Sequence, residues 1–176
     1  MIVDSFQRSH TLNDQSPGKA RDIALVEIVA GGLADPQVVH LLSVHLSTAH
    51  AQTAPGSAHA LDVSGLQAPE ISFWSAWEQG QLLAVGALKR LSSTHGEVKS
   101  MHTAEAARRR GIGSTMLRHI IDVARMSGMT RLSLETGSWD YFKPARALYM
   151  RHGFVACAPF DTYRPDRNSI FLTREL

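Results

Sequence analysis

A long amphipathic helix that follows a glycine turn constrains the fold of this chain more than any other feature of the sequence. Apolar side chains recur three or four residues apart from residue 112 to residue 124, and Gly128 ends the pattern. The segments 71–77, 82–91 and 97–103 before it contain apolar and β-favouring residues and are separated by turn residues. We predict a meander of three antiparallel strands, followed by a helix with one apolar face.

The other patterns complete a single mixed α/β domain. Asp35 and Pro36 form an N-cap followed by proline at the first helical position, which predicts a helix to about residue 51. Further strands are expected at 23–30, 131–136, 154–158 and 169–173, and further helices at 62–66 and 144–151. The expected fold is α+β, with six or seven strands and about four helices in one domain over 1–176, of which 1–20 form a tail or loop.

The composition excludes several classes of protein. An apolar fraction of 44% and a charged fraction of 19% are typical of a globular domain and not of a disordered chain. Eighteen basic against sixteen acidic residues leave a net charge of +2, too small to indicate nucleic acid or a membrane surface as a partner. The single cysteine, Cys157, excludes an intramolecular disulfide and a cysteine-rich zinc site. The first eleven residues are not a secretory signal, so we expect a cytoplasmic protein.

The glycine turn at 108–113 is the strongest candidate for a binding site. Glycines allow a sharp turn and close approach of a ligand, and the first amides of the following helix have no partner within the helix. Together with the helix dipole and the neighbouring arginines, these donors suit a diphosphate. The alternative is a tight turn with solvated arginines. A Walker loop would need a Gly-Lys-Ser/Thr triplet, which is absent, and a dinucleotide fingerprint would need glycine where Met116 stands.

The turn and a second motif resemble those of the GNAT family of N-acetyltransferases. The family's phosphate loop reads Gln/Arg-x-x-Gly-x-Gly/Ala, and its second block joins a small residue, Leu-Tyr and Gly-Phe. This chain matches both blocks, in the family's order, at Arg108, Gly111 and Gly113 and then at Ala145, Leu148, Tyr149, Gly153 and Phe154. The segment 59–62 and the tail from Pro159 through Tyr163 to the end resemble those of a poorly characterised bacterial subgroup of the family. Phe142 stands where the family often has asparagine.

The resemblance implies acetyl-CoA as co-substrate and no metal. It also implies the fold of the family, in which the fourth and fifth strands splay apart. Backbone amides of the phosphate loop would hold the diphosphate, and the backbone of the strand at 97–103 would pair with the pantetheine arm. The residues implied for cofactor binding are Met101, His102, Thr103, Arg108, Arg109, Arg110, Gly111, Ile112, Gly113 and Ser114.

Two residues are candidates for the transfer chemistry. By the resemblance, Tyr149 would protonate the departing thiolate; the alternative is a packed tyrosine that only holds its helix against the sheet. Glu97 stands fourteen residues before Gly111, the spacing of the glutamate base in the histone-acetylating branch of the family. It could accept the amine proton through a water, or it could be a solvent-exposed strand-edge residue beside Lys99.

The acceptor is expected to meet two loops. The candidates for binding it are His59 and Asp62 in one loop and Tyr163 and Asp166 in the other, unless these residues are simply solvated. His40, His45 and His50 should not converge on a metal, because steps of five residues rotate each by about 140° on a helix. We expect an acetyltransferase for a small-molecule amine. A peptide or protein amine, or a non-catalytic sensor of acyl-CoA, remains an alternative, and a homodimer is possible.

Overall fold

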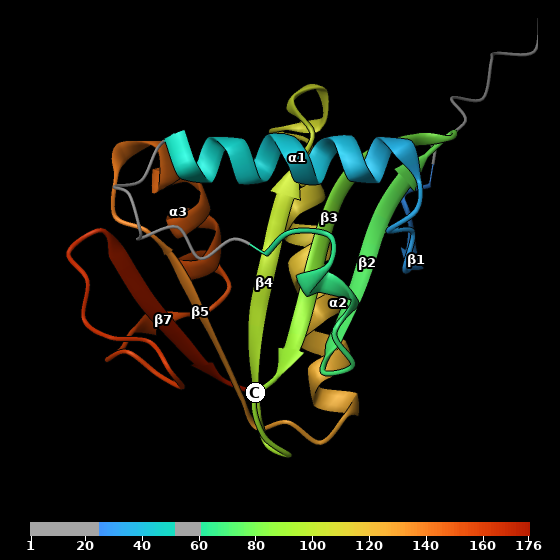
Figure 1. Ribbon diagram of the computed structural model, residues 1–176. Helices are drawn as coiled ribbons and strands as arrows, with labels where there is room; N and C mark the ends of the chain where they lie inside the picture. Colours follow the sequence, from blue (N-terminus) through green and yellow to red (C-terminus); the bar gives the residue numbers. More distant parts are fainter. Residues whose placement is uncertain (1–24, 52–60) are drawn as a thin grey trace, which may run out of the picture.

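Seven strands form one sheet in the computed structural model, which describes residues 25–51 and 61–176 (Figure 1). Their order is β1-β2-β3-β4-β5-β7-β6, and all neighbours are antiparallel except β4 and β5. The strands are β1 Glu27–Ala30, β2 Ile71–Glu78, β3 Gln81–Arg90, β4 His95–Thr103, β5 Arg131–Gly137, β6 Val155–Ala156 and β7 Ser169–Glu175. The helices are α1 Pro36–Ala51, α2 Ile112–Met126 and α3 Lys143–Arg151. The predicted mixed sheet is confirmed.

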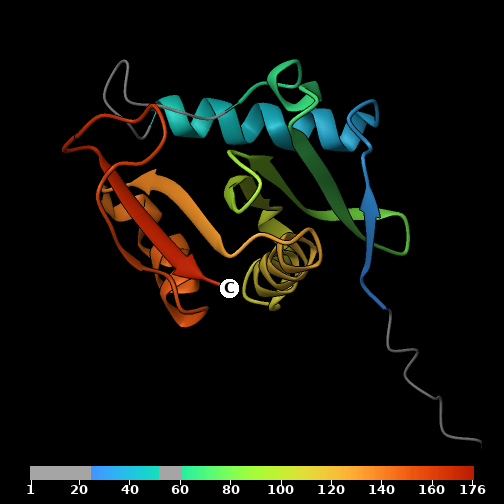
Figure 2. The same ribbon diagram turned by 90° about the horizontal axis from the view of Figure 1, so that it is seen from below.

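The helices cover both faces of the sheet. Helix α1 lies across one face, and α2 and α3 lie on the other, as the two views show (Figures 1 and 2). The α1 face is closed by a cluster that includes Val38, Leu42 and Val85. On the α2 face, the predicted apolar stripe is buried at every position: Ile112, Met116, Leu117, Ile120, Ile121 and Ala124.

Strands β4 and β5 separate after a short parallel contact. Their register pairs are 95 with 131, 96 with 132 and 97 with 133, and none follows among the described residues. Strand β5 then continues to pair with β7 as far as Gly137, so the two strands diverge towards their carboxyl ends (Figure 1). The expected splay is therefore confirmed, and it begins at Glu97.

A β-bulge in β4 sets the direction of the side chains beyond this point. Ala87 of β3 pairs with Lys99, and Val85 pairs with His102, so β4 holds one more residue than β3 between these pairs. Ser100 takes up the extra length in the left-handed region, with φ of 52°. Paired residues of an antiparallel ladder share a face. Because Val85 and Ala87 belong to the cluster beneath α1, Lys99 and His102 also lie on the α1 face.

The structure differs from the expected elements at three places. Strand β1 is limited to Glu27–Ala30, and the helix expected at 62–66 is one 3-10 turn at Gly65–Gln67, which leaves three α-helices in the described ranges. Strand β6 is reduced to Val155–Ala156, and Phe154 before it is buried in the core at 2% exposure. The tail expected at 1–20, and His59, lie outside the described residues. In the described ranges, no helix has the length and apolar character needed to cross a membrane.

Candidate active site

The glycine turn has the backbone geometry of an anion-binding loop. Gly111 adopts φ of +82° immediately before α2, a conformation that residues with a Cβ atom rarely adopt. Gly113 serves a different purpose: a Cβ there would come within 3.3 Å of Leu148 Cδ2 and 3.4 Å of Thr103 Oγ1. Gly111 therefore permits the turn, and Gly113 allows the start of α2 to lie close to the end of β4 and to α3.

The arginines of the turn point in different directions. Arg110 makes a bidentate ion pair with Glu78 at the end of β2, with Nη2 2.8 Å and 2.7 Å from the two carboxylate oxygens. Arg108 makes a long contact of 3.5 Å from Nε to the Thr103 carbonyl and is exposed. The Arg110 side chain is thus engaged within the protein, whereas the Arg108 side chain stays exposed beside the start of α2.

Tyr149 lies in the core beside the phosphate loop. It is 7% exposed and meets Phe154 edge to face. Its helix contacts the start of α2 through His152 Nε2 and Ser114 Oγ, 3.0 Å apart. Burial, reinforced by the charge of Glu135, raises the pKa of the Tyr149 phenol well above its usual value, so the phenol stays protonated at neutral pH.

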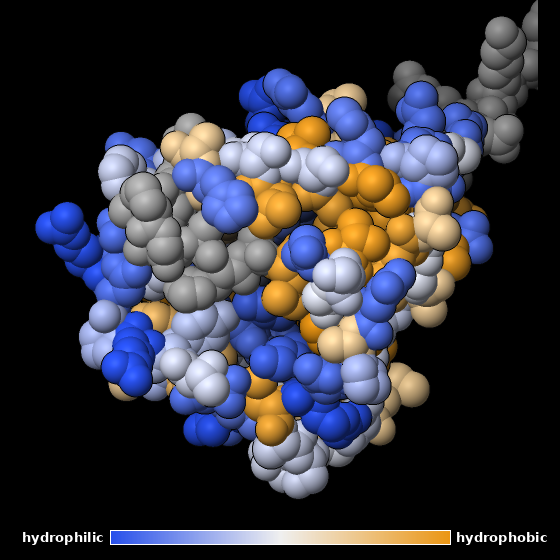
Figure 3. All heavy atoms as spheres, in the orientation of Figure 1, coloured by the Kyte–Doolittle hydropathy of each residue, from blue (hydrophilic) through white to orange (hydrophobic). Residues whose placement is uncertain are grey.

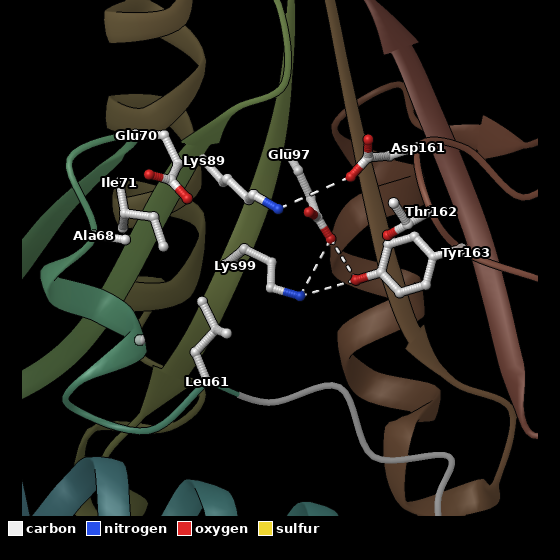
Figure 4. A pocket seen from close by; sticks show the side chains of 11 residues that line it. Leu61, Ala68, Glu70, Ile71, Lys89, Glu97, Lys99, Asp161, Thr162 and Tyr163 are labelled. Carbon is white, nitrogen blue, oxygen red and sulfur yellow. Dashed lines mark hydrogen bonds and ion pairs between the residues drawn. The ribbon is translucent and has the colours of Figure 1, made fainter.

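Glu97 is buried and bonded, which contradicts the alternative of an exposed strand-edge residue. Its side chain is 2% exposed. The Tyr163 hydroxyl donates to Glu97 Oε1 at 2.6 Å, and Lys99 Nζ lies 3.2 Å from the same oxygen and donates to the Tyr163 hydroxyl at 2.9 Å (Figure 4). Burial and the Glu97 charge raise the pKa of Tyr163 far above its usual value. This Glu97–Lys99–Tyr163 cluster joins β4 to the loop between β6 and β7.

The cluster forms one wall of a cavity of about 510 Å³. The hollow lies below α1 on the face drawn in Figure 3, where hydrophilic side chains gather beside a hydrophobic area. Lys89 and Asp161 face each other across it at 3.9 Å, each about one-third exposed. The lining residues are Leu61, Gly65, Ala68, Glu70, Ile71, Lys89, Glu97, Lys99, Asp161, Thr162 and Tyr163 (Figure 4).

Of the described residues predicted for the acceptor, the structure brings Tyr163 to Glu97 and gives Asp62 and Asp166 local contacts. Asp62 accepts hydrogen bonds from the Gly65 amide at 2.7 Å and from the Ser64 hydroxyl at 2.9 Å, and the first of these lowers its pKa most. Asp166 accepts from the Asn168 amide at 2.8 Å. Sequence reasoning missed Lys89, although the predicted hairpin of β3 and β4 pairs it with Glu97.

A pair of histidines links α1 to β4, and no pattern in the sequence indicates this contact. His45 Nδ1 lies 3.2 Å from His102 Nδ1. Burial lowers the pKa of both rings to about 4, and Lys99 acts in the same direction on His45, as Arg108 does on His102. His40 and His50 point to solvent instead. Within residues 25–51 and 61–176, no three His, Cys, Asp or Glu side chains are grouped so that they could hold a metal ion.

Comparison with known proteins identifies the family. The model of the Acetyltransferase (GNAT) family matches residues 38–154, which include the phosphate loop and the Leu-Tyr block. The chain belongs to this family.

Similar proteins include two uncharacterized N-acetyltransferases. YsnE of Bacillus subtilis (strain 168) is 49% identical over 140 residues, which cover 80% of this chain and 93% of YsnE. YedL of Escherichia coli (strain K12) is 48% identical over 144 residues, which cover 82% of this chain and 91% of YedL. With the family match, these relatives make this member of the GNAT family an acetyl-CoA-dependent acyltransferase.

Solved structures share the fold. An acetyltransferase from Streptococcus agalactiae 2603 superimposes with a TM-score of 0.67 at 22% identity, over 86% of this chain and 98% of that one. A Bacillus subtilis acetyltransferase in complex with CoA gives a TM-score of 0.65 at 18% identity, over 86% of this chain and 99% of that one.

Replacing Tyr163 with phenylalanine tests the buried cluster. Tyr163→Phe removes the donor to Glu97 and leaves a buried carboxylate with one partner fewer, so we expect the free energy of unfolding to fall by about 1–3 kcal/mol in urea denaturation. Tyr141→Phe is the matched control, because the Tyr141 side chain is 42% exposed. Equal stability of the two variants would contradict the role given to the cluster.

The histidine pair predicts how stability depends on pH. The pKa of each ring is about 4 in the folded protein against 6.5 normally, so between these values the unfolded chain binds more protons. The free energy of unfolding should therefore decrease as the pH falls from about 6.5 to about 4. In a double variant, His45→Asn with His102→Asn, this decrease should be smaller, whereas His40→Asn on the exposed face of α1 should retain it. A pH dependence unchanged in the double variant would refute the assignment.

Proposed function

We propose that this protein transfers the acetyl group of acetyl-CoA to the primary amine of a small molecule. The observation that carries the proposal is the cavity of about 510 Å³ on the α1 face, a volume typical of small-molecule sites. Its lining holds three carboxylates and two lysines, which leaves one net negative charge. That excess favours a positively charged acceptor, and Leu61 and Ile71 offer it an apolar surface.

The cofactor is proposed to lie along the splay between β4 and β5. The amides at Arg109–Ser114 would bind the diphosphate, since Gly111 opens the start of α2 to a ligand. The backbone of Met101–Thr103 would pair with the pantetheine arm, because β4 has no register pair with β5 beyond Glu97 in the described ranges. The acetyl group would then lie between the phosphate loop and the cavity.

The transfer needs an exchange of bonds at the thioester carbon and two proton transfers, and this chain offers a group for each proton transfer. The nitrogen lone pair of the amine forms a bond to the thioester carbon, and the C–S bond breaks to release the thiolate of CoA. We assign the proton lost by the amine nitrogen to Glu97, reached through a water, since Tyr163 and Lys99 already occupy Oε1. We assign protonation of the thiolate to Tyr149, whose phenol is held in its protonated form.

The proposal is tested by ligand binding followed by turnover. Acetyl-CoA should raise the melting temperature, and a panel of small amines should release free CoA thiol, with an acetylated amine seen by mass spectrometry. Gly111→Leu should abolish the thermal shift. Gly128→Leu is the matched control, because Gly128 has φ of +77°, open space around its Cβ position and a place at the other end of the same helix.

The outcomes separate the alternatives. Stabilisation by acetyl-CoA with no thiol release across the amine panel would indicate a sensor, and turnover of peptide amines alone would indicate a peptide acetyltransferase. Undiminished binding in a folded Gly111→Leu variant would contradict the cofactor site.

Replacing Glu97 with glutamine tests the proton acceptor. Glutamine still accepts the hydrogen bond from Tyr163 but cannot take a proton. We expect Glu97→Gln to lower kcat/KM by about 10²-fold below the pKa of the amine and to approach the wild-type rate above it. Glu70→Gln removes the same charge from the cavity rim and should leave the shape of the pH profile unchanged. A wild-type pH profile in Glu97→Gln would remove Glu97 from the mechanism.

A further inference from the structure

The histidine pair lies where the two proposed ligands would meet. His102 follows the bulge of β4, beyond the last pair with β5, and shares the α1 face with Lys99 and, through the Lys89 pair, with Glu97. His45 approaches from α1 at 3.2 Å between the Nδ1 atoms, with ring centroids 5.0 Å apart. His102 therefore belongs to the strand segment proposed to hold the pantetheine arm, and its side chain lies on the same face of β4 as Glu97 and Lys99, which line the acceptor cavity.

The contact between the two rings limits where their protons lie. One Nδ1 must carry the hydrogen and the other must accept it, so at least one ring is neutral. If His45 Nδ1 donates, the hydrogen of neutral His102 is on Nε2. Neither Nε2 atom has a hydrogen-bond partner in the part of the chain that the structure describes. The fully buried side-chain polar atoms without a partner in that part are Ser100 Oγ and His119 Nε2, so the two Nε2 atoms are not among them. In the tautomer with the hydrogen on Nε2, the N–H of His102 is therefore available to a ligand.

The surroundings of the His102 ring favour a role as hydrogen-bond donor over a role as general base. Burial and the cations Lys99 and Arg108 all oppose a positive charge on the pair, and no carboxylate of residues 25–51 or 61–176 offsets them. A general base must become cationic when it takes the amine proton. A neutral ring that donates an N–H gains no net charge, so this environment does not oppose it.

We propose that neutral His102 is a catalytic residue that donates its Nε2–H to the thioester oxygen, and that His45 is a positioning residue that fixes the required tautomer. The proposal rests on the proposed acetyl transfer. When the amine lone pair forms the C–N bond, the carbonyl π electrons move to oxygen, and the hydrogen bond from His102 stabilises that negative charge. When the C=O bond re-forms, the C–S bond breaks and the oxygen releases the hydrogen bond. No proton leaves His102 in either step.

Two substitutions at His102 separate a donor from a base. His102→Leu removes the N–H, and we expect kcat to fall by about 10²–10³-fold. His102→Gln retains an N–H donor and should recover at least tenfold of that loss, although glutamine cannot accept a proton. Equal losses in the two variants, together with a changed pH profile in both, would overturn the donor assignment in favour of a base. His40→Leu, on the exposed face of α1, is the control for a general effect of removing a histidine.

A spectroscopic measurement keeps the test independent of turnover. The carbonyl stretch of acetyl-CoA labelled with ¹³C at the thioester carbon should lie at lower frequency when bound to the wild-type protein than when bound to His102→Leu. Equal frequencies in the two proteins would overturn the contact. A protein that shows the shift but acetylates no amine would refute the proposed function and leave the His102 contact standing.

The role of His45 has its own readout. In the wild-type protein labelled with ¹⁵N-histidine, the ring shifts of His102 should show hydrogen on Nε2 and none on Nδ1. His45→Phe should abolish this single-tautomer signature and lower kcat with little change in the KM for acetyl-CoA. A wild-type spectrum with hydrogen on His102 Nδ1 would overturn the assignment, whether or not the variant folds.

Discussion

The end of pairing between β4 and β5 at Glu97 is the constraint on which the site depends. A closed ladder would satisfy every backbone group of β4 within the sheet and leave nothing for a ligand. Because β5 turns away to follow β7, the edge of β4 from Val98 to Thr103 becomes available just where the strand approaches the phosphate loop. Glu97, the last paired residue, lies at the boundary between the closed sheet and the open one.

The bulge at Ser100 determines which side chains accompany that open edge. Without the extra residue, His102 would point to the α2 face and Met101 to the α1 face. The bulge carries a cost, because Ser100 adopts a left-handed conformation and its buried hydroxyl has no partner in the described part of the chain. The consequence of the bulge is that His102 joins Glu97 and Lys99, which precede the bulge, on the α1 face.

The sequence predicts the parts of the site that depend on local pattern. Gly111 needs a positive φ and Gly113 a close approach, and both requirements are visible as glycine before an amphipathic helix. The family resemblance adds Tyr149 and Glu97. The exposure of Glu97 could not be predicted, because it depends on a tyrosine 66 residues later that folds back over the strand.

Contacts between elements that are distant in the sequence could not be predicted, for the same reason. The His45–His102 pair depends both on where α1 crosses the sheet and on the bulge in β4. Regular alternation of side chains along β4 would have put His102 on the opposite face. The Arg110–Glu78 ion pair requires the turn before α2 to reach the end of β2. In each case the sequence shows both residues, but not the register that joins them.

The Glu97–Lys99–Tyr163 cluster divides the cavity into parts that tolerate variation differently. A change at any one of these three residues takes a partner from the other two, and Glu97 among them is buried, so they must be retained or replaced together. Glu70 and the weakly paired Lys89 and Asp161 at the rim carry no such linkage. The rim can therefore diverge among relatives one residue at a time, over an inner wall that stays the same.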